Sequence, residues 1–239
     1  MIVKLINHTR NPIQTIFIAA RTCYSADGPE ALWNQVISPA NDNDTASSER
    51  MFSLIDKVIA SGHMSVLEHI SFTFAIEGIS RACSHQLVRH RIASFSQQSQ
   101  RYVAVKDDDF VVPNSIESNP DAMNIYEKLL HDAQSAYKSL MALGVPQEDA
   151  RFALPNASFT NIVMTMNFRE LHQVCQIRLC TRAQWEIREL FWKAKSEIKN
   201  IEELKGLAEY LQPKCIMLGY CPEHKSCGMM PGKDEIFQK

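Results

Sequence analysis

The sequence predicts an α+β fold in a single domain covering residues 1–239. Residues 70–77 alternate between apolar and polar side chains, which is typical of a half-buried strand. Residues 119–144 have the pattern of a long helix, with Asn119 as its cap and Pro120 in its first turn. The length fits one large domain or two small ones, and no repeat or linker divides the chain.

The other elements follow from local patterns, taken in chain order. Besides 70–77, the expected strands are 1–9, 101–105 and 157–167. Besides 119–144, the expected helices are 12–25, 47–63, 78–90, 146–155, 168–180 and 183–211. Residues 38–50 and 91–100 are polar without a sustained period, so both are expected to be loops. The tail at about 212–239 is expected to be irregular.

Composition limits the class of partner. Lys plus Arg is 25 and Asp plus Glu is 27, a net charge of −2, whereas broad nucleic-acid binding usually needs a basic domain. Any anion site must therefore be local. The N-terminus becomes polar too early for a signal peptide, and we find no apolar run of the roughly 20 residues that a membrane span needs. We expect a cytoplasmic protein without a membrane partner.

Cysteine usage agrees with a reducing compartment. Seven cysteines, an odd number, are spread over a large chain and are expected to be thiols: 23, 83, 175, 180, 215, 221 and 227. In the tail, Cys215, Cys221, His224 and Cys227 provide four possible zinc ligands, but their spacing is not that of a standard ribbon or finger. The sequence therefore predicts no metal site.

Residues 89–102, RHRIASFSQQSQRY, concentrate hydrogen-bond donors without a carboxylate. Arginine presents a planar fork of donors that suits bidentate phosphate binding. The alternative is a solvated basic turn whose ion pairs contribute little. Sequence motifs of other nucleotide sites and hydrolases, GxGxxG, GxxxxGK[ST], GxSxG and HExxH, do not occur.

Three further segments carry polar side chains of the same kind. GHMSVLEH contains His63, EDARFALP contains Arg151, and NFRELHQVCQIRLC contains Asn167 and Arg178. On a helix, positions 167, 171, 174 and 178 share one side, so Arg178 is expected on a partly apolar face, where an arginine needs an anion or an electron-rich ring as partner.

Together these segments resemble the flavin-dependent thymidylate synthases. The matching motifs are RHR followed by seven residues and Ser99, the GHxSxxEHxxFTF lead-in, the AR…LP helix, and NxR…RLxxxAQWEIR. The resemblance runs from about residue 19 to about residue 189. It implies a mostly antiparallel central sheet flanked by helices, in an intertwined homotetramer with FAD at subunit interfaces. It also implies reductive methylation of dUMP to dTMP, with methylenetetrahydrofolate as carbon donor and NADPH as reductant.

The resemblance also implies roles for individual residues. The dUMP-binding positions are Gln86, Arg89, Gln97, Ser99, Gln100, Arg101, Arg151 and Arg178. The FAD-binding positions are His63, Ser65, Arg89, His90, Arg91, Gln97, Asn167, Arg169 and Gln173. The implied catalytic residue is Arg178, which would stabilise negative charge on the uracil ionised at N3. Gln97 stands where glutamate is frequent, and Gln173 stands where asparagine is expected.

A function of another class is a nucleic-acid-binding module that uses the RHR loop. It predicts a colourless protein with salt-sensitive affinity for polynucleotides. The near-neutral charge and the few aromatic residues near the loop, Phe95 and Tyr102, favour the enzyme. Ser99 has no histidine or acid partner evident in the sequence, so we expect it to bind phosphate or substrate and not to act as a nucleophile.

Overall fold

The computed structural model describes residues 1–37, 45–105 and 109–237. Its strands are β1 (Ile2–His8), β2 (Ser71–Ser80), β3 (Ala93–Gln97) and β4 (Phe159–Asn167). Its longer helices are α1 (Pro12–Thr22), α2 (Pro29–Val36), α3 (Thr45–Ala60), α4 (Arg81–Leu87), α6 (Pro120–Ala142), α8 (Phe168–Arg178) and α9 (Trp185–Lys199). Short helical segments are η1 (Met64–His69), α5 (Asn114–Glu117), α7 (Gln147–Ala150), η2 (Arg151–Ala153), η3 (Glu202–Leu204), α10 (Lys205–Ala208), α11 (Lys214–Leu218) and α12 (Lys233–Phe237). The predicted α+β class is confirmed.

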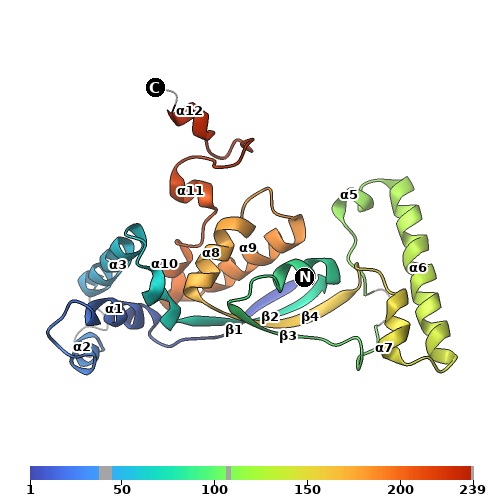
Figure 1. The fold of residues 1–239 in the computed structure, drawn as a ribbon, viewed down its shortest axis with the longest axis horizontal. Helices are drawn as coiled ribbons and strands as arrows, with labels where there is room; N and C mark the ends of the chain where they lie inside the picture. Colours follow the sequence, from blue (N-terminus) through green and yellow to red (C-terminus); the bar gives the residue numbers. More distant parts are fainter. Residues whose placement is uncertain (38–44, 106–108, 238–239) are drawn as a thin grey trace. The chain divides into compact units, whose positions relative to one another are not determined.

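The strands form one antiparallel sheet in the order β1-β2-β4-β3 (Figure 1). The register of β2 on β4 is fixed at both ends of the pair. The Phe168 amide donates to the Ile70 carbonyl at 2.9 Å, and the Arg81 amide donates to the Ser158 carbonyl at 3.0 Å. The predicted alternation of β2 is confirmed, because Phe72, Phe74 and Ile76 are buried while the residues between them are more exposed. β4 alternates in the same way.

The chain forms two compact units by its internal contacts. Unit 1 contains Met1–Val3, Ala75–Arg91 and Phe95–Met164, and unit 2 contains Lys4–Phe74, Ile92–Ser94 and Thr165–Lys239. In unit 1, α6 packs against α5, α7 and η2. In unit 2, α8 packs against η1, α9 and α11, and α1 packs against α2, α3 and η1. The single catalytic domain over 1–239 stays a prediction.

Five local predictions were wrong. Residues 101–105 form turns and not a strand, whereas a strand, β3, lies inside the stretch expected to be a loop. The expected helix 183–211 ends at Lys199, because Ile201 has an extended backbone and the chain restarts in short turns. The expected helix 78–90 begins only at Arg81. The tail contains two short helices, α11 and α12.

Part of the expected polar loop at 38–50 lies outside the described residues, and from Thr45 onward that stretch is already helical. Among the described helices, none combines the length and apolar character that crossing a bilayer requires.

Candidate active site

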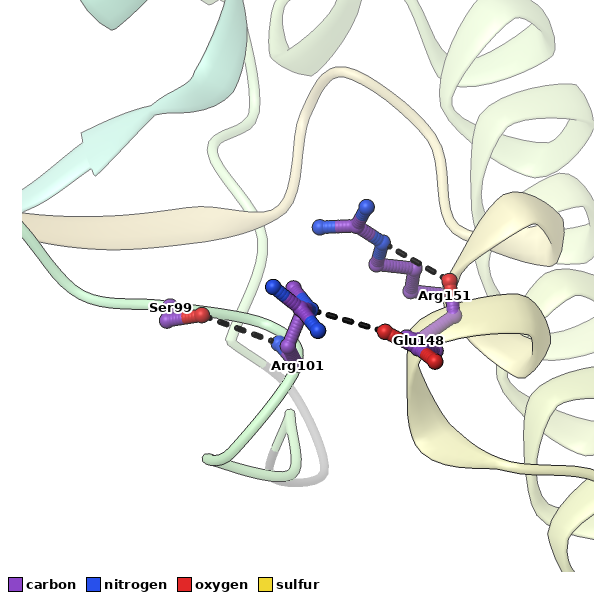
Figure 2. Close-up of polar contacts among 4 residues, drawn as sticks. All are labelled: Ser99, Arg101, Glu148 and Arg151. Atoms are coloured by element: carbon purple, nitrogen blue, oxygen red, sulfur yellow. Dashed lines mark hydrogen bonds and ion pairs between the residues drawn. The ribbon is translucent and has the colours of Figure 1, made fainter.

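Unit 1 brings together three of the predicted phosphate-binding residues. Figure 2 shows Arg101 and Arg151 each joined to Glu148 by a hydrogen bond, with Ser99 on the same loop as Arg101. Arg101 Nε donates to Glu148 Oε2 at 2.8 Å, and Arg151 Nε donates to the Glu148 carbonyl at 2.9 Å. Ser99 Oγ accepts a hydrogen bond from the Arg101 amide at 3.2 Å, which closes the turn after β3. Two arginines from segments 50 positions apart therefore lie at one place.

Arg81 adds a third guanidinium to this region of unit 1. Its Nη2 donates to the Gln98 carbonyl at 2.8 Å, while its Nε is buried without a hydrogen-bond partner among the described residues. Burial lowers the pKa of Arg81, and the neighbouring charge of Arg151 lowers it further. Such mutual repulsion between cations is relieved when an anion binds beside them.

A cavity of about 400 Å³ opens beside Arg81, and Gln98, Gln100 and Asn161 are among its lining residues. The Asn161 side chain donates to Gln98 Oε1 at 3.2 Å and accepts from the Gly78 amide at 3.1 Å. The side chains of Gln98 and Asn161 are therefore fixed by hydrogen bonds to each other and to the backbone of β2. Of the predicted substrate residues, Gln100 is the one that the structure places in this wall.

The RHR motif follows α4 directly. Ser80 Oγ accepts the Cys83 amide at 2.9 Å and caps α4, whose last turn carries the half-buried Gln86. After the helix, Arg89 and Arg91 are exposed and His90 is half-buried. The capped helix α4 is therefore followed by two arginines that are exposed to solvent.

The Gln97 side chain is hydrogen-bonded to buried residues of unit 1. Its Nε2 donates to Ser84 Oγ at 3.0 Å and to Thr160 Oγ1 at 3.1 Å, and both hydroxyl residues are buried. A glutamate at this position could not donate these hydrogen bonds. The glutamine therefore fits its own surroundings, and it ties β3 to α4 and β4.

In unit 2, α8 carries the predicted cofactor residues from its first turn onward. Asn167 is its N-cap, and its Oδ1 accepts the Glu170 amide at 2.8 Å. Arg169, the second residue of the helix, forms an ion pair with Glu68 of η1. That pair links α8 to the segment carrying His63 and Ser65, which are both exposed.

Further along α8, two neighbouring residues differ in burial. Gln173 is exposed, whereas His172 is buried, with Nδ1 at 3.2 Å from Gln176 Nε2. Burial lowers the pKa of His172, so it stays neutral near pH 7. Gln173 is thus the side chain of the pair that a ligand in solvent can reach.

Arg178 lies in the last turn of α8 and is half-buried. Leu171 and Val174 precede it on the same side of the helix and are fully buried. The predicted partly apolar face is therefore confirmed. Its apolar neighbours place the guanidinium where water screens charge less than in bulk.

The predicted residues thus divide between the units, and three relevant side chains were given no role. Gln86, Arg89, His90, Arg91, Gln97, Ser99, Gln100, Arg101 and Arg151 belong to unit 1, and His63, Ser65, Asn167, Arg169, Gln173 and Arg178 belong to unit 2. The residues that were given no role are Glu148 and Glu68, which pair with predicted arginines, and Arg81. Glu68 stands inside the GHMSVLEH motif, which was the available signal.

Comparison with known proteins places these motifs in context. A family profile described as "Thymidylate synthase complementing protein" matches residues 4–202. The chain is 46% identical over 236 residues to a flavin-dependent thymidylate synthase of Pyrococcus horikoshii, covering 96% of this chain and 92% of that protein. It is 42% identical over 246 residues to one of Geobacter sulfurreducens, covering 100% and 99%.

A solved structure has the same fold. It is a UMP/dUMP methylase, PolB, from Streptomyces cacaoi bound with 5-Br dUMP. The TM-score is 0.72 at 21% sequence identity, with 89% of this chain and 96% of that chain covered.

Proposed function

Because the chain belongs to the flavin-dependent thymidylate synthases, we propose that it methylates dUMP reductively to dTMP. The carbon donor is methylenetetrahydrofolate, the reductant is NADPH, and the flavin is FAD. The predicted site residues keep the roles that the family resemblance implies for them.

The observation that carries this proposal is the convergence of Ser99, Arg101 and Arg151 in unit 1. Arginine forks bind phosphate oxygens through paired, charge-assisted hydrogen bonds. The nearby Arg81 adds positive potential. The phosphate of a nucleoside monophosphate is the anion that this cluster binds, and the side-chain amides of Gln86 and Gln100 contact the rest of the nucleotide.

The chemistry of a second donor set fits FAD. Arg89 and Arg91 are exposed cations that suit a pyrophosphate, and Ser65, Arg169 and Gln173 are exposed donors in unit 2. When bound, the flavin supplies the redox chemistry of the reaction. The protein's part is to hold it, with His63, His90, Gln97 and Asn167 completing the set.

Arg178 acts on the substrate as the catalytic residue. Its guanidinium hydrogen-bonds the uracil ring and stabilises the negative charge that makes C5 nucleophilic. A cysteine nucleophile is not required. Burial raises the pKa of Cys175, on the same helix, to about 12, so this thiol is not ionised near neutral pH.

Exposed apolar side chains support the homotetramer that we propose with this function. Ile125 and Leu129 lie one turn apart on α6 with 73% and 53% of their surface exposed. Of the described residues of this long helix, only Tyr137 is buried. Contiguous exposed apolar surface marks protein contacts. In an intertwined tetramer, residue groups from different subunits complete one site.

The direct test is product formation. Purified protein is incubated with dUMP, methylenetetrahydrofolate and NADPH, and dTMP is measured by mass spectrometry, with each component omitted in turn. We expect dTMP only in the complete mixture and a yellow protein with a flavin spectrum. A colourless protein that binds polynucleotides and forms no dTMP would instead support the nucleic-acid-binding function.

Arg101→Ala is expected to weaken dUMP binding by about ten- to a hundredfold, because one charge-assisted contact contributes about 1.5–3 kcal/mol. Deoxyuridine, which lacks the phosphate, should bind wild type and variant equally. Both affinities are measured by calorimetry with the flavin-loaded protein. The ion pair with Glu148 is at the surface, so stability should change by less than about 1 kcal/mol.

The matched control is Arg50→Ala, which removes an exposed arginine of α3 and should leave dUMP affinity unchanged. Equal losses for dUMP and deoxyuridine in Arg101→Ala would contradict the assignment of Arg101 to the phosphate.

Light scattering coupled to size exclusion is expected to report a tetramer that carries flavin. Ile125→Glu and Leu129→Glu together place charges on the exposed stripe of α6 and should shift the mass toward smaller species. Glu117→Gln, which alters an exposed charge on the neighbouring α5, is the control. A wild-type monomer that retains stoichiometric flavin would contradict the shared site.

A further inference from the structure

Four of the seven cysteines line one cavity in unit 2. This tail cavity has a volume of about 310 Å³, and its thiols are Cys180, Cys215, Cys221 and Cys227. Cys215 and Cys221 are buried, Cys180 is half-buried and Cys227 is exposed. Four cysteine residues thus line one small volume.

The fold brings them together from two distant segments. Cys180 comes two residues after the end of α8, whereas Cys215 lies on α11 and begins a C-x5-C-x5-C series in the tail. The Cys221 amide donates to the Pro231 carbonyl at 2.7 Å, and Cys221 pairs with Gly232. This contact closes residues 221–232 into a loop that contains Cys227.

An ion pair holds the two segments in contact. Arg182 Nε lies 3.3 Å from Glu223 Oε2, which joins the end of α8 to the tail loop. Arg182, Lys214 and Lys225 also line the tail cavity. Glu223 also lines the cavity, so its wall carries three cations and one carboxylate.

We propose that the tail cavity is a metal site in which Cys180, Cys215, Cys221 and Cys227 bind one Zn²⁺ ion. Zinc favours four sulfur or nitrogen ligands in a tetrahedral arrangement, and a set of four thiolates selects it over harder cations such as Mg²⁺. The three lining cations balance part of the negative charge of the tetrathiolate site.

Among the described residues, no three His, Cys, Asp or Glu side chains already stand in a metal-binding arrangement. Loading must therefore draw the thiols inward. Each cysteine can turn about a single side-chain torsion between staggered positions. Because the ligands come from α8 and from the tail, the metal would fasten the tail to the end of the helix that carries Arg178.

The spacing in the sequence considered a different set of ligands. It combined Cys215, Cys221 and Cys227 with His224, whose spacing is irregular. In the described part of the chain, Cys180 lines the cavity and His224 does not. Cys180 is 35 positions upstream of Cys215, too far for a local motif. The family profile ends at residue 202, so family membership does not depend on the tail cysteines.

The test is elemental analysis of the full-length protein after chelation under reductant, reloading with zinc and dialysis. We expect one zinc per chain for wild type and for Cys23→Ser, which removes an exposed cysteine outside the cavity. Cys180→Ser and Cys215→Ser should weaken zinc binding about a hundredfold or more, measured by competition with a chromogenic chelator. Cobalt in place of zinc should give thiolate-to-metal charge-transfer absorption that both variants lose.

If Cys180→Ser or Cys215→Ser does not fold, Cys227→Ser provides the same test, because the Cys227 side chain is exposed. Substoichiometric zinc in reloaded wild type, or equal zinc affinity in all variants, would overturn the proposal. A disulfide among these cysteines found by mass spectrometry of the protein as purified would also overturn it. None of these measurements uses turnover, so failure here is separable from failure of the proposed reaction.

Discussion

Arg178→Ala is expected to lower the rate of dUMP methylation by about a hundred- to a thousandfold, while bound flavin persists. The loss follows from removing one preorganised donor from a developing anion, which costs about 2.7–4 kcal/mol. The half-buried position above Leu171 and Val174 makes this charge more effective than an exposed one. Single-turnover kinetics measure the rate of methylation, and the visible flavin spectrum measures how much flavin stays bound.

Two comparisons make this prediction specific. Arg178→Lys retains a charge but loses the planar fork, so it should recover only part of the rate. Arg50→Ala, an exposed helical arginine of α3, should leave the rate unchanged. A rate for Arg178→Ala near that of wild type would show that the uracil charge is stabilised elsewhere. Loss of the flavin spectrum would instead assign Arg178 to cofactor binding.

The elements that the sequence predicted correctly have strong periodic signals. β2 buries alternate residues, and α6 begins at Pro120 after its cap Asn119, as predicted, and ends at Ala142, two residues before the predicted end. β3 was missed because Ala93–Gln97 is a short edge strand whose residues are only half-buried or exposed, and its alternation contains just two apolar residues, Ala93 and Phe95. Its pairing with β4 is a tertiary property and has no local signal.

The candidate site was likewise predictable only where a local signal exists. Arginines and amides in dense polar motifs could be found from residue type, and the side of α8 shared by Asn167 and Arg178 follows from helical spacing. The partners of those residues could not be found. Glu148 pairs with Arg101 across 47 positions, and the Cys180 thiol approaches the tail only through the fold. Pairwise contacts of this kind depend on the packing of distant segments.

Phe168 connects core packing to the candidate site. Its ring is fully buried and lies 5.9 Å from the Phe72 ring at an interplanar angle of 54°. Its amide donates to the Ile70 carbonyl at 2.9 Å. Phe168 is also the first residue of α8, between the cap Asn167 and Arg169. The Phe168 ring therefore packs α8 against β2, and its backbone amide joins the first residue of α8 to the residue before β2.

Phe168→Ala is expected to lower the free energy of unfolding by about 3–5 kcal/mol, the range for a buried phenylalanine reduced to alanine. Phe168→Leu keeps most of the apolar volume and should cost less than about 1.5 kcal/mol. Denaturant unfolding, at one protein concentration because subunit association adds to stability, measures both. Without denaturant, Phe168→Ala should also bind flavin more weakly, since Asn167 and Arg169 flank the cavity that the missing ring leaves. Equal stability of the two variants would show that the Phe72–Phe168 contact does not anchor α8.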